Sequence, residues 1–199
     1  MFGSALRVYA GSVTSPAPYR PPLTYRDYCL LPEDGRRYEL MEGDFFESPA
    51  PSTDHQTVSR RLLFELMRQL EHPGLAYVFN APVDVILEDT SVVQPDLVVV
   101  AANRKQLVTK RAIEGAPDIA VEILSPSSID RDRHLKRRLF ERFGVSEYWI
   151  VDAEHAMVDV LHFVDGGYRQ IAKLDRASTL TSRRFAQLAI VLEPIFRPL

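Results

Sequence analysis

The chain has 199 residues and only one cysteine, Cys29, so it can build neither an internal disulfide framework nor a zinc site made of several cysteines. It also lacks any apolar run near the ~18 residues that span a bilayer. The simplest expectation from these two absences is a cytoplasmic protein that does not enter a membrane. We expect Cys29 to be a small core residue of the first helix.

Charge of one sign is missing as well, because 24 basic residues face 27 acidic ones. The net charge of −3 argues against a protein that coats nucleic acid by charge alone. Several catalytic signatures are absent too: the glycine-rich phosphate loop, the GxSxG elbow and the HExxH helix. No two of the five histidines have metal-ligand spacing on one helix face. These absences exclude the commonest nucleotide-binding, serine hydrolase and zinc protease classes.

What the chain has is the composition of an ordinary globular protein, with 46% hydrophobic and 26% charged residues. Residues 1–22 include four prolines among small residues, which predicts a flexible, extended arm. Order is expected to begin at Leu23. Residues 23–199 have the length of one domain, and we predict a single domain there.

Three helices are predicted. Thr24 and Asp27 resemble a capping box that starts a short helix, which Pro32 ends. A second helix starts after residues 52–54, carries an apolar stripe at four-residue spacing and stops at 73–74; the stripe is Val58, Leu62, Leu66 and Leu70. A third spans roughly 128–143, with Gly144 as its stop.

Strands are predicted around these helices. A hairpin is expected at 37–48, strand-like runs at 75–79, 83–87 and 97–100, buried strands at 118–124 and 147–151, and a second hairpin from 157–164 and 168–173. A short helix and loop are expected at 103–115, and a weakly periodic closing segment from Leu180. This order predicts an α/β or α+β fold, with a mixed central β-sheet flanked by helices.

Two acids interrupt runs that otherwise have core composition. Asp96 precedes the apolar residues 97–100, and Glu122 lies within the buried strand 118–124. A buried carboxylate is costly unless a cation, a proton or a metal compensates it. One such acid is more often structural, but two on strands that can be neighbours indicate a site for a hard divalent cation such as Mg²⁺ or Mn²⁺.

Lys136 lies on the third helix in a stripe with apolar ends, so it points toward the sheet. The alternative is a snorkelling lysine whose ammonium reaches water. Since methionine has a similar volume, we expect Lys136→Met to preserve folding. Glu39 is a further candidate that alternation leaves undecided between the site and an exposed strand face. His55 can be a substrate-side residue, although a surface histidine is the simpler interpretation.

The third helix also carries arginines that read as a solvated basic surface able to grip phosphates, among them Arg133 and Arg137. We assign Arg133 and Arg137, with His55 and Gln94, to substrate binding.

Several blocks together resemble the Uma-two family of putative restriction endonucleases, a branch of the PD-(D/E)XK nuclease superfamily. The blocks are YELMEG at 38–43, HQ at 55–56, QPDLVVV at 94–100, GAPDIAVEILSPSS at 115–128, Lys136, and GVSEYWIVD at 144–152. The likeness covers about residues 23–165, and the order and spacing of the blocks make it specific.

The resemblance implies a restriction-endonuclease-like core with Asp96 and Glu122 as the motif acids. Leu124 stands where the usual motif lysine would be, and Lys136 matches the position to which that role migrates. Glu39 matches the N-terminal glutamate of the family. The implied chemistry is hydrolysis of DNA phosphodiester bonds with Mg²⁺ or Mn²⁺ held by Asp96, Glu122 and the carbonyl of Ile123.

Two other functions stay open. One is a non-catalytic module that keeps the nuclease fold for nucleic-acid binding or oligomerisation, and the other is a metal-dependent hydrolase of another phosphate ester. The expected partner is double-stranded DNA. By analogy with restriction-type nucleases, which often cut two strands as dimers, we expect a homodimer.

Overall fold

The computed structural model describes residues 20–198 apart from 33, 49, 126–128 and 130. The predicted arm, residues 1–22, lies almost entirely outside this range. Within the described part, no helix combines the length and apolar character needed to cross a membrane.

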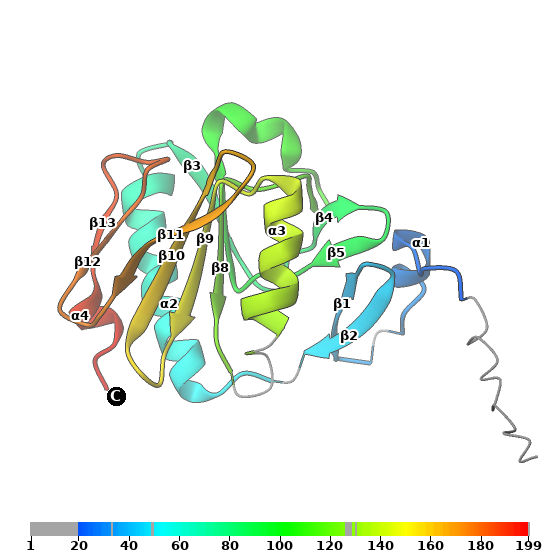
Figure 1. Ribbon diagram of the computed structural model, residues 1–199, viewed down its shortest axis with the longest axis horizontal. Helices are drawn as coiled ribbons and strands as arrows, with labels where there is room; N and C mark the ends of the chain where they lie inside the picture. Colours follow the sequence, from blue (N-terminus) through cyan, green and yellow to red (C-terminus); the bar gives the residue numbers. More distant parts are fainter. Residues whose placement is uncertain (1–19, 33, 49, 126–128, 130, 199) are drawn as a thin grey trace, which may run out of the picture.

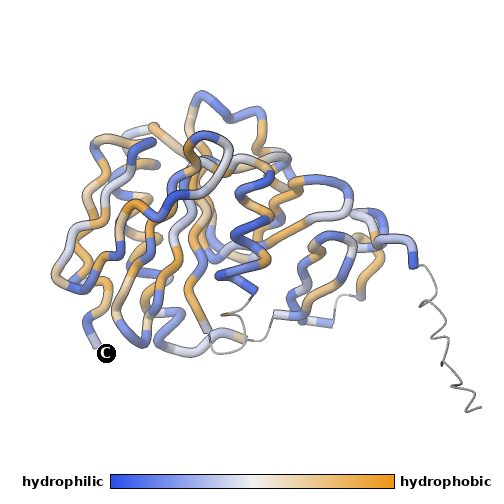
Figure 2. The backbone as a smooth tube through the Cα atoms, viewed as in Figure 1, coloured by the Kyte–Doolittle hydropathy of each residue, from blue (hydrophilic) through white to orange (hydrophobic). Residues whose placement is uncertain are grey.

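A six-stranded mixed sheet forms the centre of the fold (Figure 1). Its strands lie in the order β11-β10-β9-β8-β6-β3. The β8–β9 pair is parallel, and the other neighbours are antiparallel. The bounds are β3 Ala76–Asn80, β6 Leu97–Ala101, β8 Ile119–Ile123, β9 Glu147–Asp152, β10 Met157–Val164 and β11 Gly167–Leu174. Strands β6 and β8 are buried at every position, which confirms the predicted central strands. Hydrophobic segments gather in the middle of the molecule, where the central sheet lies (Figure 2).

Helices pack on the two faces of this sheet through separate hydrophobic clusters. On one face lies α2 (Thr53–Leu66), which continues as the π-turns of η1 (Met67–Glu71) and buries the predicted apolar stripe. On the other face, α3 (Arg137–Phe143) buries Leu139 and Phe140 against Ala120 and Tyr148. Gly144 ends α3 at φ 70°, a left-handed conformation that glycine adopts without strain.

The start of the third helix differs from the expectation of a regular α-helix. Residues Arg131–Lys136 form π-turns, η3, in front of α3, and residues 128 and 130 lie outside the described part. Ile129, an apolar end of the predicted stripe, is 41% exposed. The middle of the stripe behaves as predicted, because Asp132 and Lys136 are buried.

A second sheet of five strands lies beside the first, in the order β2-β1-β5-β4-β7. Its bounds are β1 Arg37–Met41, β2 Asp44–Ser48, β4 Val85–Glu88, β5 Ser91–Val93 and β7 Ile113–Glu114. The chain leaves β5 and enters β6 of the central sheet through residues 94–96. Residues of this short crossing, Asp96 included, therefore lie between the two sheets.

The first helix, α1 (Tyr25–Tyr28), has the predicted capping box, in which the backbone N–H of Thr24 donates to the Asp27 carboxylate at 2.8 Å. Cys29 follows this helix and is exposed, so the expectation of a core cysteine was wrong. Helix α1 is a single turn with no buried residue, and Cys29 lies just beyond its last residue.

The C-terminal part packs over α2. Strands β12 (Thr179–Thr181) and β13 (Ala189–Val191) pair with each other, and α4 (Leu192–Ile195) follows. Buried residues of this part join the hydrophobic cluster of α2, and the Arg61 guanidinium donates to the carbonyls of Ile195 (3.1 Å) and Arg197. The remaining element, the 3₁₀ helix η2 (Ala102–Leu107), lies in the predicted helix and loop region.

Candidate active site

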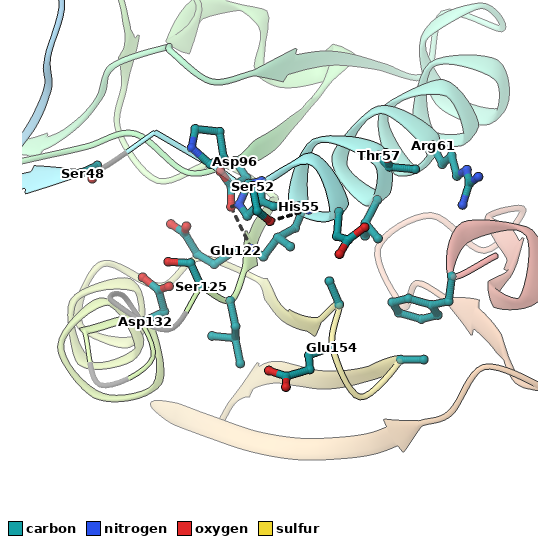
Figure 3. Close-up of a pocket in the computed structure, with 18 of the residues that line it drawn as sticks. Ser48, Ser52, His55, Thr57, Arg61, Asp96, Glu122, Ser125, Asp132 and Glu154 are labelled. Atoms are coloured by element: carbon teal, nitrogen blue, oxygen red, sulfur yellow. Dashed lines mark hydrogen bonds and ion pairs between the residues drawn. The ribbon is translucent and has the colours of Figure 1, made fainter. Parts of the chain in front are cut away.

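Asp96 and Glu122 come together at one end of the central sheet. Strands β6 and β8 are antiparallel with Leu97 opposite Val121, so the register continued by one residue sets Asp96 against Glu122. Both carboxylates line one cleft of about 930 Å³. Figure 3 shows Asp96 and Glu122 beside each other in this cleft, with Asp132 next to them. The structure therefore brings to one place the two acids that the sequence singled out.

Asp96 is held by two donors. Its Oδ2 accepts a hydrogen bond from the backbone N–H of Ile123 at 2.8 Å and lies 3.1 Å from Nε2 of His55. Burial by itself raises the pKa of Asp96, but the hydrogen bond and charge of His55, with the Ile123 N–H and Lys136, outweigh it and lower the pKa. The fold thus favours the ionised carboxylate at this position.

Lys136 is enclosed by three carboxylates. Its Nζ lies 2.6 Å from Oε1 of Glu122, 2.9 Å from Oε1 of Glu39 and 3.7 Å from Oδ1 of Asp132, and the residue is 2% exposed. Snorkelling to water is thereby excluded. Burial opposes its charge, but these three acids more than compensate and raise its pKa, so Lys136 is an ammonium here.

Acidic groups outnumber the permanent cations around this lysine. Among the described residues, the cluster of Asp96, Glu122, Glu39 and Asp132 has four carboxyl groups and two permanent cations, Lys136 and Arg131, so at most two of the acids lack a permanent counter-charge. Burial raises the pKa of Glu122 far above its usual range, and the other three acids raise it further against the opposing effect of Lys136. Such a cluster favours an additional cation.

The donor set fits a hard divalent cation, because carboxylate oxygens are the ligands that Mg²⁺ prefers. Among the described residues, no three His, Cys, Asp or Glu side chains are grouped to hold a metal ion. In the described part of the chain, Asp96 and Glu122 are the pair of side chains that could hold such an ion.

Glu39 belongs to the site rather than to an exposed strand face, since it is 1% exposed. Besides Lys136, its Oε1 accepts the backbone N–H of Gln94 at 2.8 Å. The Gln94 side chain lines the cleft but is already engaged, as its Nε2 donates to Asp84 (2.9 Å) and Tyr28 (3.1 Å). In this structure Gln94 positions Glu39.

His55 is buried, so the expectation of a surface histidine was wrong. It lies in the first turn of α2, where Ser52 Oγ caps the helix by accepting the His55 N–H. The sequence shows the turn and its cap, but only the packing of α2 against the central sheet reveals that this turn faces Asp96. The pairing of His55 with Asp96 is the feature that sequence patterns missed.

The cleft walls carry a different set of arginines from the one predicted. Those lining it are Arg37, Arg61, Arg131, Arg176 and Arg197. Arg133 lies outside the cleft and pairs with Asp159 at 2.8 Å, and Arg137 is exposed elsewhere on α3. The π-turns of η3 direct Arg131 to Glu39 and Asp132, which regular helical spacing does not indicate.

The chain is similar to known proteins in sequence and in fold. No curated protein matches the chain. A crystal structure of a putative nuclease belonging to DUF820 from Anabaena variabilis superposes with a TM-score of 0.74 at 20% sequence identity, over 88% of this chain and 98% of that one, which shows a shared fold. The Uma2 family, described as "Putative restriction endonuclease", matches residues 24–193. Since that match spans most of the chain, the protein belongs to the Uma2 family of putative restriction endonucleases.

Proposed function

We propose that this protein is a metal-dependent endonuclease that hydrolyses phosphodiester bonds of DNA, with Mg²⁺ or Mn²⁺ as its cofactor. The observation that carries the proposal is the buried cluster of acidic side chains around Lys136, which lies at an arginine-lined cleft of about 930 Å³. Family membership supports the same class of chemistry. A divalent cation would bind at the acids of this cleft, and a phosphate substrate would bind at its arginines.

The cation would be held by Asp96 and Glu122, with the main-chain carbonyl of Ile123 as a further ligand. A divalent ion at such a site stabilises charge on the phosphate and lowers the pKa of a bound water. Asp96 is prepared for this role because its carboxylate is kept ionised. His55 and the Ile123 N–H fix its orientation.

Lys136 would neutralise the scissile phosphate and orient the attacking water. An ammonium is a compact point charge with three donors, so it can keep one bond to Glu39 while another donor turns to substrate. Glu39, fixed by Gln94, would hold Lys136 at the reacting centre and contact the outer water shell of the cation.

The arginines of the cleft would bind phosphates on either side of the cut. Arg131 lies 3.9 Å from both Glu39 and Asp132, and Arg37 donates to Gln94. Arg61 lies farther along α2 (Figure 3). A homodimer that places two such clefts on one duplex stays a prediction by analogy.

The test is plasmid cleavage with Mg²⁺, with Mn²⁺ and with EDTA. We expect cleavage only with metal, and its loss in Glu122→Gln. Glu154→Gln is the matched control, since Glu154 is an exposed acid that lines the same cleft and is not one of the acids paired with Lys136. Metal-independent cleavage, or equal activity of both variants, would contradict the proposal.

A second candidate is a module that binds nucleic acid, or a second copy of itself, without cutting. One observation favours it. Lys136 already pairs with an oxygen of Glu122 and an oxygen of Glu39, so the lysine partly neutralises these acids without a metal ion. Nucleic-acid binding with no cleavage under any metal would select this alternative.

A further inference from the structure

A second groove lies beside the cleft, between α2 and the C-terminal part of the chain. Its volume is about 680 Å³, and its lining is formed by Arg60, Arg61, Phe64, Glu65, Arg68, Ala189, Val191, Pro194, Ile195 and Arg197. Neither the acids of the candidate active site nor Lys136 contribute to it. The proposed chemistry therefore does not explain the use of this groove.

Phe64 is the unusual feature of this groove. Its side chain sits on the outer face of α2 and is 62% exposed, although an aromatic ring of this size is normally buried. Arg60 and Arg68 stand four residues before and after it, so the three side chains form one stripe along the helix. An exposed ring between two arginines combines a stacking surface with two phosphate-binding groups.

Charge in the groove opposes the charge of the whole protein. Four arginines line it against one acid, Glu65, which Arg68 already pairs at 2.6 Å. The groove is thus locally positive on a chain whose net charge is −3. This complementarity favours an anionic polymer over a second copy of the same acidic chain.

The groove is also continuous with the cleft. Arg61 and Arg197 line both cavities, and the Arg61 guanidinium is fixed at their junction by the carbonyls of Ile195 and Arg197. A strand whose phosphate lies among Asp96, Glu122 and Lys136 can therefore continue along the cleft into the groove.

We propose that this groove binds an unpaired nucleotide of the nucleic-acid substrate, with its base stacked on Phe64 and the flanking phosphates on Arg60, Arg68 and Arg197. The inference rests on the proposed function, whose substrate it specifies. A base within a duplex is stacked on its neighbours and cannot cover Phe64. The groove therefore selects a strand that is single at this point, such as an overhang or a locally opened site.

The experiment measures binding of the full chain in EDTA by fluorescence anisotropy. The probes are a labelled single strand, a blunt duplex of the same sequence, and that duplex with a single-stranded extension. Phe64→Ala should weaken binding of the first and third probes by about 5- to 150-fold, the usual effect of losing one stacked base, and leave the blunt duplex unchanged. Ile171→Ala is the control, since Ile171 is an exposed apolar residue outside both cavities, at 55%.

The arginines are tested by the salt dependence of the same binding. Arg60→Gln combined with Arg68→Gln should reduce the slope of log K against log salt for the single strand by about 1.4, the contribution of two phosphate contacts. Arg183→Gln, an exposed arginine that lines neither cavity, should leave the slope unchanged. Thermal melting verifies that each variant is folded.

Three results would overturn the inference. If the wild type binds and cuts DNA while Phe64→Ala binds every probe as tightly as the wild type does, the groove has no role in binding and the endonuclease proposal stands. If Phe64→Ala instead lowers the oligomeric state in sedimentation without weakening binding, the groove contacts a second copy. If the wild type binds no probe, both proposals fail. Weakened binding in Phe64→Ala with no cleavage by the wild type would support the groove and reject the endonuclease.

Discussion

The ammonium of Lys136 lies 2.6 Å from Oε1 of Glu122, although the two residues belong to a helical segment and to a buried strand. Both are almost completely buried, and the same lysine lies 2.9 Å from Glu39 of the second sheet. Lys136 thus joins both sheets at the candidate active site. Its charge has a structural role as well as the proposed catalytic one.

Replacement of Lys136 by methionine should therefore destabilise the protein, contrary to what side-chain volume alone led us to expect. Loss of the ammonium leaves Glu39, Glu122 and Asp132 without their main counter-charge, and breaking a buried pair in this way costs about 3–5 kcal/mol. Urea denaturation of metal-free Lys136→Met measures the free energy of unfolding. Adding Glu122→Gln should recover part of the loss, and a double variant no more stable than the single one would contradict this account.

The raised pKa of Glu122 predicts a pH dependence of stability without metal. Burial and the neighbouring acids make the folded protein hold a proton on Glu122 above the usual value of 4.5, where the unfolded chain has released it. The free energy of unfolding should then fall as pH rises from about 4.5 through the raised pKa.

Glu122→Gln cannot release this proton, so it should lose that slope and be at least as stable as the wild type at pH 8. The measurement is urea denaturation in EDTA across this pH range, with the difference between the two proteins taken at each pH. Titrations shared by both proteins cancel in the difference. Parallel curves would show that Glu122 does not titrate in this window.

Much of the fold could be predicted because its central strands have no polar face. Residues 97–100, 118–124 and 147–151 are apolar on both sides, and this pattern is typical of strands covered by helices on both faces. For the same reason Asp96 and Glu122 stood out in the sequence. Their proximity depends only on β6 and β8 being neighbours, and the structure places these strands side by side.

The residues that contact these acids could not be predicted, because they are brought there by tertiary packing that local sequence patterns do not indicate. His55 has a sequence environment typical of an exposed first helical turn, but the packing of α2 on the central sheet buries it beside Asp96. Regular helical spacing also misplaces the arginines, since π-turns set Arg131 toward the site and leave Arg133 outside it. Two further arginines of the cleft come from the C-terminal part: Arg176 lies in the turn before β12, and Arg197 lies in the weakly periodic segment from Leu180.

His55 is expected to act on metal binding through Asp96. A residue that orients a ligating carboxylate typically contributes about 10- to 100-fold to metal affinity. His55→Gln should weaken Mn²⁺ binding by this factor in calorimetry and lower cleavage at limiting metal, while saturating metal restores most of the rate. His155→Gln is the matched control, since His155 is an exposed histidine that pairs with Asp152. Equal Mn²⁺ affinity in wild type and His55→Gln would remove His55 from the site.

The last prediction separates cation binding from folding at Asp96. Asparagine keeps the size of the side chain and an oxygen able to accept the Ile123 N–H, but it removes the negative charge that a divalent ion requires. Since the fold lowers the pKa of Asp96, the ionised carboxylate contributes to stability, and metal-free Asp96→Asn should be somewhat less stable than the wild type. Repulsion between the two acids acts in the opposite direction, and the contact of Asp96 with His55 outweighs it.

Thermal melting with and without Mg²⁺ tests both parts of this prediction. A cation that binds only the folded state stabilises the wild type by about 2.7 kcal/mol at a hundred times its dissociation constant, and Asp96→Asn should lose this increment. Plasmid cleavage should disappear in the same variant, while DNA binding in EDTA persists through the arginines of the cleft. If Mg²⁺ raises both melting temperatures equally and neither protein cleaves DNA, the ion binds elsewhere and the protein is a binding module that retains the nuclease fold.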